Sequence, residues 1–155
     1  MKDALRAAQH KMLRSGVRGN YTPTENMHLT LAFIGEYPDA EPIRDALSPL
    51  RFEPFELSLD GMGCFGKLWW AGLGESAQLA ALVRRLRRAL AENGIPFDRK
   101  RFSPHVTLIR KASGKLPAMQ IEPVSMTVNT VSLMRSDRGR NSMIYTELAA
   151  WEAEG

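Results

Sequence analysis

The feature that most constrains this chain is a short pattern, His-x-Thr-x, that occurs twice. His28-Leu29-Thr30-Leu31 lies near the start, and His105-Val106-Thr107-Leu108 lies in the second half. The chain has only three histidines among its 155 residues, and two of them open a copy of this pattern. Packing alone does not account for two matching copies that each combine an imidazole with a hydroxyl. We therefore expect the two copies to serve one site.

Both copies lie in stretches that are typical of β-strands. The ranges 27–34 and 102–109 are rich in β-branched and aliphatic residues, which suit a pleated strand. Because residues i and i+2 of a strand share a face, His28 and Thr30 would project to one side, while the two leucines of the pattern enter a core. The second copy repeats this arrangement. Two such strands facing each other would form a pocket with two imidazoles and two hydroxyls.

These groups suit acid–base chemistry on a phosphate. Imidazole titrates near neutral pH, so one histidine can take a proton from water while the other gives one to a departing oxygen. Such help is worth on the order of 10²–10⁴ in rate. The hydroxyls of Thr30 and Thr107 are neutral donors for phosphate oxygens, and Arg110 adds a planar cation suited to the same group. The pattern predicts metal-free hydrolysis of a phosphodiester with His28 and His105 as the catalytic pair.

A zinc site is the main alternative for the two histidines. Each copy of the pattern offers one ligand per strand, and no cluster of Cys, His, Asp or Glu lies beside either copy, whereas a structural zinc site uses four ligands. We therefore expect no metal and no other cofactor.

Composition limits the classes of binding partner and the cellular compartment that we expect for this chain. The net charge of +4 favours an anionic partner, for which RNA is the natural candidate. No apolar run approaches the roughly 18 residues that span a bilayer, so we expect no membrane partner. The single cysteine, Cys64, excludes an internal disulfide and is typical of the reducing cytoplasm.

Hydrophobic periodicity predicts an α+β fold in one domain. Apolar residues at helical spacing and the flanking Gly, Pro and Ser residues predict helices at 3–15, 42–50 and 76–93. The segment 17–26 is expected to be a turn region. Besides the two motif strands, we expect strands at 55–63, 68–73, 124–134 and 143–148. Each half then contains helices and one His-x-Thr strand, which suggests two similar lobes facing each other, with mainly antiparallel sheets.

The residues around both patterns resemble the 2H phosphoesterases. The first signature runs from Pro23 to Glu36 and the second from Ser103 to Arg110, and the stretches 63–73 and 131–145 also fit. The sequence is most similar to the bacterial and archaeal RNA 2′,3′-cyclic phosphodiesterases, also called 2′-5′ RNA ligases. This resemblance covers nearly the whole chain. It implies a bilobal fold over residues 1–155, in which two antiparallel sheets face a central cleft and the helices lie outside.

The resemblance also implies an activity, which is the opening of RNA 2′,3′-cyclic phosphate ends to 2′-phosphates, with 2′-5′ RNA ligation as the reverse reaction. By position the resemblance makes His28 the general acid and His105 the base that orients water. It makes Phe33 a residue that stacks on the terminal base. The residues that it implies as phosphate ligands are Thr30, Thr107 and Arg110. Two other interpretations stay open. The substrate could be a small cyclic nucleotide, or the pocket could bind RNA ends without catalysis.

One departure from the family concerns the start of the chain. The resembling proteins usually open with a strand before the first helix, whereas here the helix begins almost at Met1. Either one sheet lacks a strand, or Met1 is an internal methionine of a longer reading frame. A missing strand would leave an unpaired edge that can pair with another chain. The sequence does not fix the oligomeric state.

Overall fold

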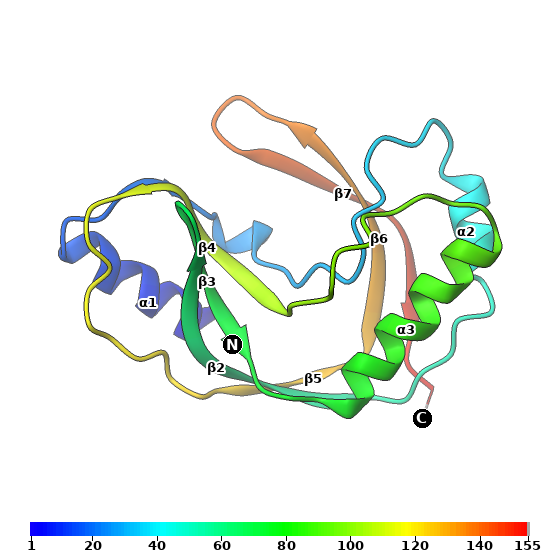
Figure 1. Ribbon diagram of the computed structural model, residues 1–155, viewed down its shortest axis with the longest axis horizontal. Coiled ribbons are helices and arrows are strands. Elements are labelled where there is room, and N and C mark those ends of the chain that lie inside the picture. Colours follow the sequence, from blue (N-terminus) through cyan, green and yellow to red (C-terminus); the bar gives the residue numbers. More distant parts are fainter. Residues whose placement is uncertain (155) are drawn as a thin grey trace.

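The computed structural model describes residues 1–154, and its strands form two antiparallel sheets (Figure 1). The larger sheet has the order β1-β4-β3-β2-β5 and the smaller one joins β6 to β7. The strands are β1 (Arg18–Tyr21), β2 (Phe55–Phe65), β3 (Leu68–Leu73), β4 (His105–Ser113), β5 (Ser125–Val128), β6 (Thr130–Arg138) and β7 (Met143–Glu152). The helices are α1 (Lys2–Arg14), α2 (Glu41–Leu47) and α3 (Ala77–Glu92), with a 3-10 turn η1 (Thr24–Asn26). The predicted α+β fold with antiparallel sheets is confirmed.

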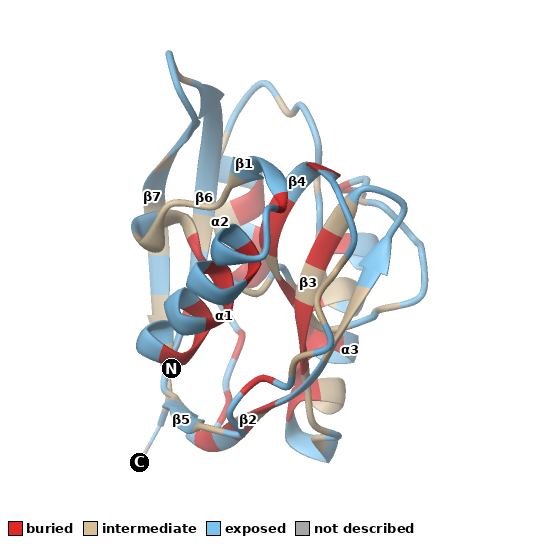
Figure 2. Ribbon diagram, turned by 90° about the vertical axis from the view of Figure 1, so that its left-hand side faces the viewer, coloured by how far each residue is buried: buried red, intermediate tan, exposed pale blue. Residues whose placement is uncertain are grey.

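Helix α1 covers one face of the larger sheet and forms the first apolar core. Its residues Leu5, Ala8 and Met12 are buried together with Leu108 and Ile109 of β4. Figure 2 shows the buried positions along one side of α1 and along β3 and β4. The side chain of Gln9 also enters this core, where its Nε2 donates hydrogen bonds to the backbone oxygens of Thr22 and Leu108, both at 2.9 Å. These bonds remove the cost of burying an amide.

A second apolar core lies under α2 and α3. The buried stripe of α3 meets residues of α2, the first half of β2 and the β6–β7 sheet. Its main members are Ile43, Leu47, Phe55, Leu57, Leu82, Leu86, Leu90 and Val131. Ser76 begins α3, because its hydroxyl oxygen accepts a hydrogen bond from the backbone N–H of Leu79 at 3.1 Å, which satisfies one free donor of the first turn. None of the described helices has the length and apolar character of a membrane-spanning segment.

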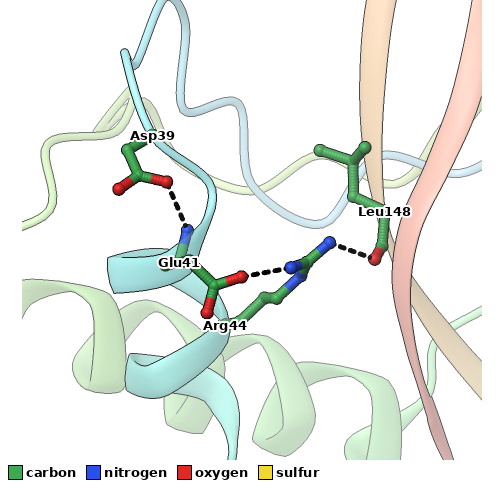
Figure 3. A network of polar contacts seen from close by, with 4 residues as sticks. All are labelled: Asp39, Glu41, Arg44 and Leu148. Carbon is green, nitrogen blue, oxygen red and sulfur yellow. Dashed lines mark hydrogen bonds and ion pairs between the residues drawn. The ribbon is translucent and has the colours of Figure 1, made fainter.

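Arg44 fastens α2 to the smaller sheet (Figure 3). One guanidinium nitrogen pairs with the carboxylate of Glu41 on the same helix, and another donates to the backbone oxygen of Leu148 in β7 at 2.8 Å. Asp39 accepts a hydrogen bond from the backbone N–H of Glu41 at 3.0 Å and so satisfies a donor of the first turn. The network fixes α2 against β7.

The first motif strand, predicted at 27–34, is not a strand of either sheet. The segment is extended but carries a single bridge, between Leu29 and Val106. Its carbonyl groups bind elsewhere, since Leu31 accepts from the Arg87 guanidinium at 3.2 Å and Phe33 accepts from the backbone N–H of Asp98 at 2.8 Å. The alternating pattern correctly marked the buried side, but a strand also needs a neighbour along its length.

Several other elements have bounds that differ from the predicted ones, mainly because strand pairing lengthens some strands and divides another. The segment 17–26, predicted as a turn region, contains β1, which pairs with β4. Strand β4 begins at His105 rather than 102, after Pro104, a residue that has no N–H for a ladder. Strand β2 continues through its glycines to Phe65, and the predicted strand 124–134 is divided at Asn129 into β5 and β6. Helix α2 ends at Leu47 rather than 50, and β7 runs on to Glu152.

The free edges of the smaller sheet lead to a prediction about association. Within residues 1–154, β6 and β7 pair only with each other, and unpaired strand edges can accept a strand from another chain. We expect the mass from light scattering to rise above the monomer value of 17.3 kDa as the concentration increases. A constant monomer mass together with a high melting temperature would contradict this prediction.

Candidate active site

The two His-x-Thr segments lie side by side and run in opposite directions. The bridge between Leu29 and Val106 is antiparallel, and extending its register by one residue each way sets His28 opposite Thr107 and Thr30 opposite His105. Bridged residues point to the same side, so these four neighbours project together on the other side. Diagonal positions in such a ladder lie roughly 7–8 Å apart, which leaves space for a phosphate between the two imidazoles.

Both imidazoles are held by the same backbone contact. The Nδ1 atom of His28 lies 2.6 Å from the carbonyl oxygen of Asn26, and the Nδ1 atom of His105 lies 2.7 Å from that of Ser103. A carbonyl oxygen can only accept, so Nδ1 must carry the hydrogen in both rings. This fixes the tautomer and leaves Nε2 of each neutral imidazole as the nitrogen that can accept a proton.

The surroundings of the two imidazoles differ. His28 is exposed and its ring centre lies 4.9 Å from that of Tyr145 in β7. His105 is half-buried, with the edge-on ring of Phe65 at 5.2 Å and the Trp70 indole at 6.0 Å. Trp70 fits there because it crosses Gly63, where an added Cβ would lie 2.5 Å from the indole. His28 therefore lies in an open position, whereas His105 lies against the aromatic rings of Phe65 and Trp70.

A pocket of about 470 Å³ opens beside His28. On one side it is bounded by β1, η1 and β4, and on the other by the turn between β6 and β7. Its lining is Asn20, Tyr21, Thr22, Pro23, Asn26, His28, Thr107, Arg110, Lys111, Arg138, Gly139, Arg140, Asn141, Ser142, Met143 and Tyr145. The presence of both His28 and Thr107 agrees with the register of the bridge.

The pocket is strongly cationic. Arg110, Lys111, Arg138 and Arg140 line it, and no Asp or Glu does. Within the described part of the chain, none of these four cations forms an ion pair. Tyr21 stays neutral, because burial raises the pKa of its phenol above the usual range and its hydroxyl donates to the backbone oxygen of Val17 at 2.8 Å. An anion is the ligand that such a lining favours.

The remaining sequence-predicted residues lie outside this pocket. Thr30 and His105 are not part of its lining, although the bridge register places them next to each other on the same face. Phe33 is 63% exposed, so its ring is free to meet a ligand, but it does not line the pocket either. No group of three or more His, Cys, Asp or Glu side chains gathers within residues 1–154.

Sequence reasoning missed Asn26 and the tip of the β6–β7 hairpin. Asn26 offers its carbonyl oxygen to His28, and its side-chain nitrogen donates to the backbone oxygen of Met143 at 2.8 Å. It therefore connects the first histidine to the hairpin. Two signals in the sequence pointed to Asn26: it lies within the first family signature, and its position two residues before His28 matches that of Ser103 before His105.

Comparison with known proteins identifies the family. The sequence model of the 2′-5′ RNA ligase superfamily matches residues 3–140. The chain belongs to this superfamily. A relative from Geobacillus stearothermophilus, named RNA 2′,3′-cyclic phosphodiesterase, is 35% identical over 120 residues, which cover 69% of this chain and 38% of that protein. A relative of the same name from Aeropyrum pernix is 32% identical over 165 residues, which cover 96% of this chain and 94% of that protein.

Solved structures of superfamily members agree with this assignment. The crystal structure of E. coli LigT complexed with 3′-AMP has a TM-score of 0.79 and 29% sequence identity to this chain, and the match covers 100% of this chain and 94% of LigT. LigT has also been solved with phosphate and with ATP.

Proposed function

We propose that this protein hydrolyses the 2′,3′-cyclic phosphate ends of RNA to 2′-phosphates, and that it needs no metal ion to do so. The observation that carries the proposal is the antiparallel pairing of the two motifs, which projects His28 and His105 on one face with both Nε2 atoms available. The cationic pocket, whose lining contains no Asp or Glu, supports a phosphate substrate. The relatives named RNA 2′,3′-cyclic phosphodiesterase and the LigT complex with 3′-AMP support RNA ends.

The reaction divides the proton transfers between the two histidines. In our proposal the Nε2 atom of His105 takes a proton from water as its oxygen bonds to phosphorus. The bond from phosphorus to the 3′ oxygen breaks, and the Nε2 atom of His28 gives that oxygen a proton. The products are a 2′-phosphate and a 3′-hydroxyl. A 5′-hydroxyl in place of water would give a 2′-5′ linkage by the same transfers.

The other groups would hold the phosphate and the base. Thr30 and Thr107 each lie beside a histidine and can donate to the non-bridging oxygens, where negative charge grows in the transition state. Arg110 supplies the nearby fixed cation. The exposed ring of Phe33 would stack on the terminal base, a contact that tolerates any sequence. We also place the enzyme in the cytoplasm, since its one cysteine, Cys64, is free and exposed.

One assay tests the proposal against its alternatives. The protein is incubated with an oligonucleotide that ends in a 2′,3′-cyclic phosphate, with EDTA present, and with 2′,3′-cyclic AMP in a parallel reaction. We expect the oligonucleotide to be opened to a 2′-phosphate at the same rate with and without EDTA. Binding without turnover would identify a recognition module, turnover of the mononucleotide alone would change the substrate class, and loss of activity in EDTA would overturn the metal-free mechanism.

The pH dependence is a separate prediction. One histidine must be neutral and the other charged at the start of the reaction, so kcat/KM is expected to rise and then fall with pH. The profile is measured on the oligonucleotide from about pH 5 to pH 9. A flat profile over that range would show that the two imidazoles do not share the proton transfers.

Asn26 offers a test of how the first histidine is positioned. Asn26→Ala removes the hydrogen bond to Met143 but keeps the carbonyl oxygen that holds Nδ1 of His28. One such bond is worth about 0.5–1.5 kcal/mol, so we expect kcat/KM to fall roughly twofold to tenfold. Asn93→Ala removes an asparagine at the end of α3 and serves as the control, which should keep wild-type activity. Equal activity of the two variants would show that the link to the hairpin is unimportant.

A further inference from the structure

We propose that the tip of the β6–β7 hairpin, residues 138–143, binds the RNA backbone next to the terminal cyclic phosphate and so selects a polynucleotide over a cyclic mononucleotide. The proposal rests on the proposed function, since it concerns the substrate of the same site. It assigns a binding role to Arg138 and Arg140, which the two His-x-Thr motifs do not include.

The hairpin tip forms the wall of the pocket that faces β1 and β4. In Figure 1 the hairpin extends beyond the body of its sheet toward the side of the molecule where β1 and β4 lie. The pocket lining confirms the approach, because it takes every residue from Arg138 to Met143 on one side and Asn20 to Pro23 with Arg110 and Lys111 on the other. The catalytic groups His28 and Thr107 lie in the same lining. A strand of RNA that enters this space passes the tip.

The number of cations exceeds what one terminal phosphate needs. A cyclic phosphodiester carries one negative charge, for which Arg110 beside Thr107 is sufficient. Lys111, Arg138 and Arg140 then remain, and no carboxylate of the pocket or ion pair in residues 1–154 neutralises them. Every further nucleotide of an RNA strand brings one more negative charge. A backbone of at least two phosphates therefore matches this lining better than a single cyclic nucleotide does.

The backbone of the tip is held in place, so the chain positions that carry Arg138 and Arg140 are set before the RNA arrives. The backbone N–H of Gly139 donates to the oxygen of Ser142 at 2.9 Å and closes the turn. The turn is tight, since a Cβ on Gly139 would lie 2.5 Å from that oxygen. Asn26 adds the hydrogen bond to Met143 from the segment that carries His28. A turn that is already closed in the free protein reduces the backbone entropy lost on binding.

The closing experiment compares two substrates in one variant. Arg138→Gln/Arg140→Gln is assayed with 2′,3′-cyclic AMP and with a hexanucleotide that ends in a 2′,3′-cyclic phosphate. We expect KM for the hexanucleotide to rise about tenfold more than KM for the mononucleotide, with kcat for both substrates close to wild type. The control is Arg84→Gln/Arg85→Gln, which removes the same charge from exposed positions of α3 and should leave both substrates unaffected.

A binding measurement separates this proposal from the proposed function. A labelled hexanucleotide that ends in a 2′-phosphate cannot be turned over, and its affinity is measured at several salt concentrations. Arg138→Gln/Arg140→Gln should lose two contacts to the RNA backbone. Its slope of log K against log salt should therefore be shallower than that of wild type by about 1.4, at about 0.7 per contact. That change supports the tip proposal even if the wild type opens no cyclic phosphate. An unchanged slope, or an equal loss of activity on both substrates, overturns it even if the wild type is active.

Discussion

Replacing His28 or His105 by alanine is expected to lower kcat on an RNA 2′,3′-cyclic phosphate by about 10²–10⁴-fold. Each imidazole is held through Nδ1 by a backbone carbonyl, so under the proposed mechanism each variant loses an oriented proton-transfer group. His28 is exposed and His105 half-buried, so the loss should come with little change in the melting temperature. Steady-state kinetics and thermal unfolding of the same samples check both points.

The third histidine provides the matched control. His10 is exposed on α1, and His10→Ala should keep wild-type kcat. Groups that act as a unit are not additive, so His28→Ala/His105→Ala should be only slightly slower than the worse single variant. Wild-type kcat in either single variant would overturn the two-histidine mechanism.

A modified substrate can tell the acid from the base. If sulfur replaces the 3′ oxygen of the cyclic phosphate, the leaving group is a thiolate, which departs without a proton more readily than an alkoxide does. His28→Ala should then recover much of its lost rate, because its proposed role is to protonate that atom. His105→Ala should stay slow, because water must still lose a proton. Recovery in His105→Ala instead would exchange the two assignments.

The sequence predicted the parts of the site that depend on local alternation. The alternation predicted that the two leucines of the first motif point into a core, and the structure has them partly buried against the second core. It predicted that His28 and Thr30 project to the other side, and both are exposed there. The second motif behaved in the same way, with Val106 and Leu108 buried. The apolar stripe of α3 was recognisable for a similar reason, since helical spacing shows which side meets the core, and so was that of α1 except for Leu13, which is exposed.

What the sequence did not predict depends on partners far along the chain. A strand is completed by its neighbour, so no local pattern shows that 27–34 has one bridge or that Arg18–Tyr21 pairs with β4. Arg87 lies among arginines that would suit a solvated helix face, yet its guanidinium binds the backbone oxygens of Leu31 and Lys100. The hairpin tip likewise has the composition of an ordinary polar turn. Only the fold shows that it reaches the segment that carries His28.

The second large effect that we expect is on stability, and it tests the inward side of the second motif. Leu108→Ala should lower the free energy of unfolding by about 2–5 kcal/mol, since Leu108 is fully buried and its removal leaves a cavity. For a chain of this size the melting temperature should fall by roughly 2–4 °C for each kcal/mol. Urea unfolding measures the free energy directly.

Leu13→Ala is the matched control for that measurement, because Leu13 lies on α1 with 62% of its surface exposed. It should change the free energy of unfolding by no more than about 0.5 kcal/mol. At a temperature where Leu108→Ala remains folded, its kcat should stay within about threefold of wild type, since the neighbouring Thr107 and His105 keep their place on β4. A large loss of kcat in the folded variant would show that Leu108 also positions the catalytic side of the strand, whereas an unchanged stability would show that this part of the core is loosely packed.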